Sequence, residues 1–78
     1  MEFEKIREIV AEHLGKDEAL ITLETNFTED LGADSLDLFQ IITELEEIFD
    51  LEFSDAEAEG IRTVGDAAEF VRQALGSN

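Results

Sequence analysis

Large apolar residues in the middle of the chain recur at intervals of three and four residues. On an α-helix this spacing places all of them within about 60° of one direction. The residues of this stripe are Leu38, Ile41, Ile42, Leu45 and Phe49. We therefore expect a helix from Ser35 to about Phe49 that packs the stripe into a core.

Two other stretches show the same helical period. The first should end at Gly15, because glycine commonly follows the last residue of a helix. Its apolar stripe consists of Phe3, Ile6, Ile9, Val10 and Leu14. The last stretch should begin at Thr63-Val64-Gly65-Asp66, which resembles a capping box, and end near Leu75. Its stripe consists of Val64, Ala67, Ala68, Val71 and Leu75, with Phe70 on its flank.

A short helix and a long loop complete the expected fold. Ser54-Asp55-Ala56-Glu57 is a capping box and should open a short helix that ends near Gly60. The segment 16–34 shows no clear period, apart from a turn expected at Thr25-Asn26. Its apolar residues should hold it to the core: Leu20, Ile21, Leu23, Phe27 and Leu31. The expected fold is all-α, a small antiparallel four-helix bundle of three main helices plus one short helix, with a long first loop.

The composition narrows the possible functions of the chain. Its 78 residues predict a single domain, residues 1–78, and they hold 21 acidic and five basic residues, a net charge of −16. Such a charge argues against nucleic acid and stable membrane binding, and it favours protein partners with basic surfaces. Without an apolar run of spanning length or a signal peptide, we expect a cytoplasmic protein. We also expect a monomer.

The run from Asp30 to Asp37 contains a serine at the point where loop becomes helix. Asp34 is a favourable N-cap and Asp37 follows it by three residues, so Ser35 should be the first helical residue. A phosphate attached there would lie beside the free N–H groups of the helix start. Because two aspartates flank the serine, a covalently attached phosphate is favoured over a free one.

This octet, Asp30-Leu31-Gly32-Ala33-Asp34-Ser35-Leu36-Asp37, resembles the signature of acyl carrier proteins, most closely the free-standing type of fatty acid synthesis. The resemblance extends over nearly the whole chain. It implies that Ser35 carries 4'-phosphopantetheine, transferred from coenzyme A by a phosphopantetheinyl transferase, and that the protein is a carrier and not an enzyme. Since the chain has no cysteine, the thiol of an acyl thioester must come from this group.

Two apolar residues beside Ser35 fall outside the core stripe, Leu36 by about 160° and Phe39 by about 100°. We interpret them as a docking surface for fatty acid synthesis enzymes with basic patches. The acids around them are Asp34, Asp37, Glu44, Glu46 and Glu47. The alternative is that Phe39 packs against the long loop. Departures from the family's usual residues, which bear on partner choice, occur at Gln40, Thr43, Ile48 and Gly60.

The resemblance also implies a cavity for the acyl chain between the helices. By position its lining would be Phe27, Ile41, Leu45, Phe53, Ala58, Ile61, Ala67 and Phe70. The alternative is that these residues form only the ordinary core, and in an acyl carrier both descriptions can apply.

Other functions have weaker support. A hydrolase would need a base near its nucleophile, yet His13 is the only histidine and Ser35 lacks a Gly-x-Ser-x-Gly elbow. His13 alone, without cysteine, does not indicate a metal site, and the acids do not follow the calcium-loop spacing. The remaining alternatives are a carrier of polyketide, aminoacyl or D-alanyl groups, and an acidic adaptor or structural subunit that carries nothing.

Overall fold

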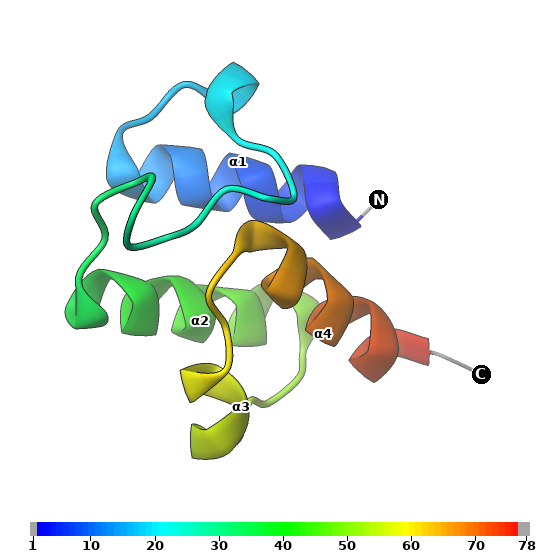
Figure 1. Ribbon diagram of the computed structural model, residues 1–78. Coiled ribbons are helices and arrows are strands. Elements are labelled where there is room, and N and C mark those ends of the chain that lie inside the picture. The colour runs from blue at the N-terminus through cyan, green and yellow to red at the C-terminus, as the bar shows by residue number, and fades with distance from the viewer. Residues whose placement is uncertain (1, 77–78) are drawn as a thin grey trace.

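The computed structural model describes residues 2–76, and the expected helices are all present (Figure 1). They are α1 (Glu2–Leu14), α2 (Ser35–Phe49), α3 (Asp55–Glu59) and α4 (Val64–Gly76), and a short 3₁₀ helix, η1 (Glu18–Leu20), lies in the first loop. Within residues 2–76, β structure is limited to an isolated bridge between Asn26 and Thr63. The predicted all-α fold is therefore confirmed. The expected tail after Gly76, Ser77 and Asn78, lies outside the described residues.

Three helices begin with the side chains that the sequence predicts as caps. At α2 the Asp37 N–H donates to Asp34 Oδ1 over 2.9 Å, and the Asp34 N–H donates to Asp37 Oδ2 over 3.3 Å. The same reciprocal pair forms between Ser54 and Glu57 at α3. At α4 the Asp66 N–H donates to Thr63 Oγ1, while the Asp66 carboxylate accepts the Thr63 N–H. Because each cap satisfies N–H groups within its own segment, these helix starts are fixed locally.

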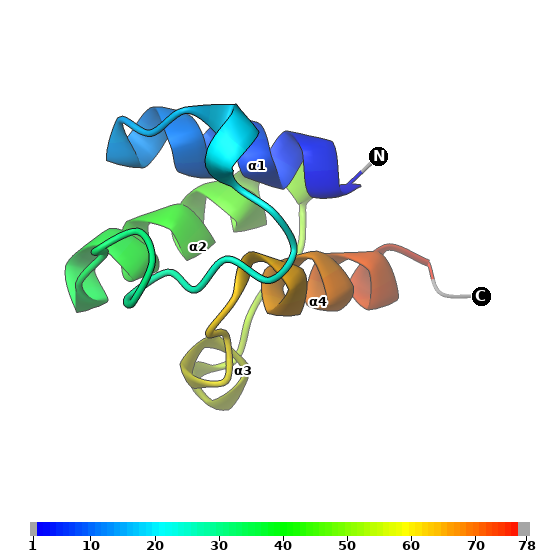
Figure 2. The same ribbon diagram turned by 45° about the horizontal axis from the view of Figure 1, so that its top comes forward.

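The core lies where α1 packs against both α2 and α4. In Figures 1 and 2 the short helix α3 lies on the side of the molecule away from α1. Fully buried side chains come from all three main helices and from the loop: Ile6, Val10, Phe27, Ile41, Leu45, Val64 and Val71. Leu38 and Phe49, at the two ends of the predicted stripe of α2, are only half-buried. Leu75, predicted in the stripe of α4, is 46% exposed because it lies in the last turn, beyond Val71.

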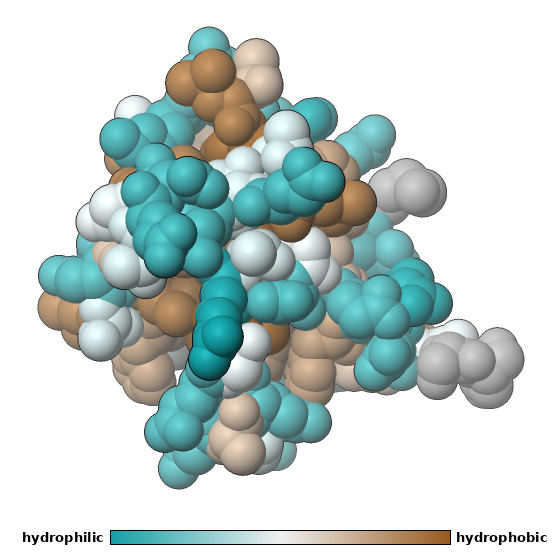
Figure 3. Space-filling model, in the orientation of Figure 1, coloured by the Kyte–Doolittle hydropathy of each residue, from teal (hydrophilic) through white to brown (hydrophobic). Residues whose placement is uncertain are grey.

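The first loop is tied to the core by three of its five predicted apolar anchors. Ile21, Phe27 and Leu31 are buried, but Leu20 and Leu23 are 71% and 51% exposed, so the prediction was wrong for these two. Leu20 ends the η1 turn, which Asp17 caps by accepting the Ala19 N–H, and the chain turns Ile21 inward instead. The apolar patch at the top of Figure 3 lies over this turn.

The second half of this loop runs beside the start of α4. The Phe27 N–H donates to the Arg62 carbonyl, the Val64 N–H to the Thr25 carbonyl, and the Gly65 N–H to the Leu23 carbonyl, over 2.8–3.0 Å. A turn does precede Phe27, but it spans residues 22–25, closed by a 3.1 Å bond from the Thr25 N–H to the Thr22 carbonyl, and Asn26 lies beyond it in the bridge to Thr63. These bonds fix the loop that leads into α2.

Candidate functional site

Ser35 is the first residue of α2, and its side chain is exposed. The capping pair Asp34–Asp37 fixes the backbone on both sides of it. The preceding turn is fixed as well, since Gly32 adopts a left-handed φ of +70° and Ala33 is buried, with its N–H donating to the Phe27 carbonyl. The serine is thus presented to solvent from a rigid position.

The surroundings of Ser35 have room for a covalently attached arm. An open hollow of about 310 Å³ runs from Ser35 between α2 and α3, and it is lined by Leu38, Phe39, Ile42, Ala58 and Glu59. Its walls are mostly apolar. The backbone N–H groups in the first turn of a helix also favour a phosphate at this end. An exposed hydroxyl, a helix start and an adjoining hollow together fit a phosphate-linked prosthetic group.

The two apolar residues predicted beside Ser35 are both on the surface. Leu36 is 61% exposed and Phe39 is 65% exposed, so the alternative in which Phe39 packs against the long loop is wrong. Among the predicted surrounding acids, Asp34 and Glu47 are exposed, whereas Asp37, Glu44 and Glu46 are half-buried. An exposed apolar pair among acids is the kind of surface that a basic partner with an apolar centre would contact.

A second hollow, of about 220 Å³, also lies between α2 and α3, and Phe39, Ile42 and Ala58 line both. Of the eight predicted cavity residues, Phe53 and Ala58 line these hollows. Phe70 stacks on Phe53 with ring centroids 4.1 Å apart. The other five are buried in the core: Phe27, Ile41, Leu45, Ile61 and Ala67.

Two residues that line the hollow beside Ser35, Leu38 and Ile42, were predicted only as members of the core stripe. The sequence did contain a signal for them, because they follow Ser35 at i+3 and i+7 and therefore share its side of the helix. Their burial in the core was inferred from the stripe alone. The position of α3 over this face could not be read from helical spacing.

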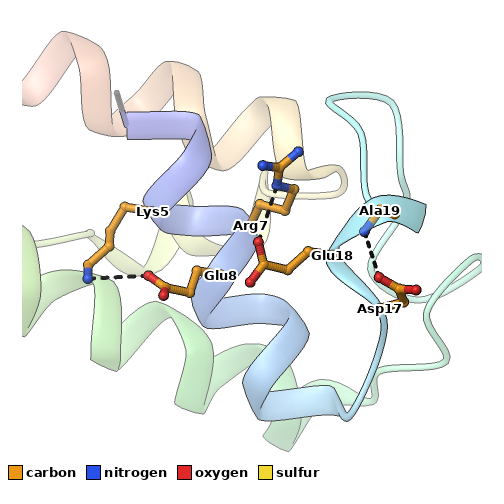
Figure 4. A network of polar contacts seen from close by, with 6 residues as sticks. All are labelled: Lys5, Arg7, Glu8, Asp17, Glu18 and Ala19. Atoms are coloured by element: carbon orange, nitrogen blue, oxygen red, sulfur yellow. Dashed lines mark hydrogen bonds and ion pairs between the residues drawn. The ribbon is translucent and has the colours of Figure 1, made fainter.

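The charge of the chain is unevenly distributed. Residues 17–61 hold 15 acidic residues and no lysine or arginine. The five basic residues lie instead in or near α1 and α4, where several pair with acids. Lys5 Nζ lies 3.4 Å from Glu8 Oε1, and Arg7 Nε on α1 lies 3.8 Å from Glu18 Oε1 on η1; Figure 4 shows both pairs. On α4 the Arg72 guanidinium, by hydrogen bonding, lowers the pKa of Glu69. The segment that carries Ser35 is therefore acidic, whereas the charges in and near α1 and α4 are nearly balanced.

Two classes of site receive no support from residues 2–76. No group of three or more His, Cys, Asp or Glu side chains in this part of the chain could hold a metal ion, and His13 is a half-buried residue at the end of α1. None of the described helices combines the length and the apolar character that crossing a membrane requires.

Comparison with known proteins identifies the family of this chain. Residues 4–71 match the family described as "Phosphopantetheine attachment site". The fold is also similar to an acyl carrier protein from Enterococcus faecalis, with 33% identity over 94% of this chain and 92% of that one and a TM-score of 0.82. The chain belongs to the acyl carrier protein family. A candidate acyl carrier protein from Mycobacterium tuberculosis is similar too, with 42% identity over 92% of this chain and 96% of that one and a TM-score of 0.87.

Membership of this family settles the general role of the protein. It is a carrier rather than an enzyme, its prosthetic group is 4'-phosphopantetheine, and a phosphopantetheinyl transferase and further partner enzymes act on it. When bound, the group supplies a flexible arm that ends in a thiol, the attachment point for acyl groups. The protein itself needs no nucleophile or base for acyl chemistry.

Proposed function

We propose that Ser35 is the attachment residue, and that the protein shuttles acyl intermediates between the enzymes of fatty acid biosynthesis. The observation that supports this proposal most strongly is the exposed serine at the first position of α2, held by the Asp34–Asp37 capping pair and open to the hollow beneath α3. In this proposal the protein is a single-domain, monomeric carrier of the cytoplasm.

The residues around Ser35 would bind partner enzymes through two kinds of contact. Leu36 and Phe39 supply exposed apolar area at the centre, and the acids around them attract basic patches on the partner. The recognition residues of this proposal are Asp34, Leu36, Asp37, Phe39, Glu46 and Glu47. Exposed charges raise the association rate more than the affinity, so the carrier can bind quickly and still leave.

The hollow between α2 and α3 would be the entrance for an acyl chain. Ala58 lines both hollows between α2 and α3, Phe53 lines the second one, and the other residues proposed for the cavity are buried or stacked on Phe53. An acyl chain that entered would move its apolar surface from water into contact with apolar side chains. Because it would bind only the folded protein, it would stabilise the folded state. Loading the arm with a medium-length fatty acyl group should therefore raise the melting temperature above that of the unacylated form. An unchanged melting temperature would contradict the cavity.

The test of the attachment residue is intact mass spectrometry after incubation with coenzyme A and a broad-specificity phosphopantetheinyl transferase. Wild type should gain the mass of one phosphopantetheine, and Ser35→Ala should gain none. Ser54→Ala is the matched control, because Ser54 also lies at a helix start but caps α3 through its side chain. That variant should be modified like wild type. Equal modification of Ser35→Ala and wild type would remove Ser35 from the proposal.

The choice of fatty acid biosynthesis rests on the Asp30–Asp37 octet and on the acidity of the surface around it. The test is loading of the phosphopantetheinylated protein by purified enzymes. A malonyl transferase of a dissociated bacterial fatty acid synthase should load it faster than a D-alanyl ligase or an aminoacyl-activating enzyme does. A higher rate with either of the latter would assign the carrier to that pathway instead.

A further inference from the structure

Glu46 organises the whole turn that leaves α2. Its backbone carbonyl accepts the N–H groups of Asp50 and Leu51, the latter over 3.1 Å. Its carboxylate reaches further along the chain, where Oε2 accepts the Phe53 N–H over 2.8 Å in a partly buried position. One residue thus binds three backbone N–H groups in the turn between α2 and α3, and its half-buried carboxylate is directed toward the chain itself rather than only toward solvent.

Phe53 is held from a second side by α4. Its ring stacks on that of Phe70, with centroids 4.1 Å apart and an angle of 26° between the planes. Phe53 immediately precedes Ser54, the N-cap of α3. The position of the first residue of α3 is therefore determined by the contacts of Phe53 with Glu46 on α2 and with Phe70 on α4.

The helix that follows has little else to hold it. Four of its five residues are exposed, and only Ala58 is half-buried. In the described part of the chain, packing between helices joins α1 to α2 and to α4, and α3 takes no substantial part in it. Its other end is attached through Ile61, which is buried. A five-residue helix is unstable alone, so its position depends on these two attachments.

We propose that Glu46 is a positioning residue, and that the Glu46–Phe53–Phe70 contact, which we name the α3 clasp, controls how far α3 opens from α2. Opening would widen the hollow lined by Phe39, Ile42 and Ala58. Glu46 then differs in role from Glu47, its exposed neighbour, which has no such contact in the described structure. The inference concerns the folded chain itself and does not require that Ser35 be modified.

The test is amide hydrogen exchange of the full unmodified chain, followed by NMR. Glu46→Ala removes the acceptor, Glu46→Gln keeps an acceptor oxygen without the charge, and Glu47→Ala is the control with the same loss of charge as Glu46→Ala. The measured quantity is the exchange rate of the Phe53 and Ala58 amides divided by that of the Val10 amide in α1. This ratio removes any general loss of stability.

In Glu46→Ala both ratios should rise about tenfold, which is the expected loss for one hydrogen bond to a charged acceptor. In Glu46→Gln they should stay within about threefold of wild type, and in Glu47→Ala they should not change. The proposal is overturned if Glu46→Ala and Glu47→Ala give equal ratios, if the glutamine variant does not restore slow exchange, or if only the Phe53 amide responds and Ala58 does not.

Discussion

Asp50 is the one residue other than glycine with a positive φ among residues 2–76, at 55°. It follows the last residue of α2, where a left-handed residue allows the N–H of the next residue, Leu51, to reach the carbonyl of Glu46. Aspartate tolerates this conformation better than most residues, but glycine adopts it at lower cost. The carboxylate is also close to the C-terminal end of a helix, where negative charge is unfavourable.

Asp50→Gly should therefore stabilise the protein by about 0.5–1 kcal/mol, which for a domain of this size raises the melting temperature by roughly 2–8 °C. Thermal unfolding followed by circular dichroism measures it. Asp50→Asn, which removes the charge and keeps a side chain, should recover only part of this gain. A melting temperature below that of wild type would show that the Asp50 side chain makes a favourable contact that outweighs its strain.

At the scale of the elements, the helices and the loop differ in how far the sequence predicts them. The starts of α2 and α3 were predicted to the residue because each capping pair lies within four residues of chain. The outward positions of Leu20 and Leu23 were not, because they follow from the η1 turn and from bonds between the loop and α4, which are far apart in sequence. The hollows between α2 and α3 were predicted only in part, because Phe53 and Ala58 were expected in the lining of a cavity and Leu38 and Ile42 were not. The exposure of Ser35, Leu36 and Phe39 could be predicted, because it depends only on the start and the period of α2.

The junction between the first loop and α4 depends on Gly65. A Cβ added there would lie 2.6 Å from the backbone oxygen of Leu23, which cannot move without breaking its hydrogen bond from the Gly65 N–H. Gly65→Ala should therefore destabilise the protein by about 1–3 kcal/mol, the usual cost of overpacking. Urea unfolding measures the change.

Gly60→Ala is the control for this prediction. A Cβ at Gly60 meets only ordinary contacts at 3.6 Å, and φ there is −82°. This variant should be neutral or stabilised by up to about 1 kcal/mol through the unfolded state. Equal effects of the two substitutions would show that the close approach of the loop to α4 is not what requires glycine at position 65.

At the scale of the whole molecule, the uneven distribution of charge should favour one orientation of approach for a charged partner. The molecule extends 32 Å along its longest axis, whereas salt at physiological concentration screens charges beyond about 8 Å. A partner therefore responds mainly to the side nearest to it. Near Ser35 it meets the acids at the start of α2 and along that helix, and along α1 and α4 it meets paired charges of both signs.

Charge reversal on the two sides should accordingly have unequal effects. Glu47→Lys on α2 and Glu12→Lys on α1 change the net charge equally, and both positions are exposed. At low salt, Glu47→Lys should slow association with the phosphopantetheinyl transferase severalfold, and Glu12→Lys should change it little. Stopped-flow association rates measure this. If both reversals slow association equally, only net charge matters and the acidic side does not orient the encounter.

The exposed hydroxyl of Ser35 at the start of α2 is the proposed point of attachment of the phosphopantetheine group. Tandem mass spectrometry of the wild-type protein after phosphopantetheinylation locates the added group on the chain directly. We predict that the group lies on Ser35 alone, in the peptide that contains Asp34 and Leu36. Finding it on any other residue, with Ser35 unmodified, would show that Ser35 is not the attachment residue.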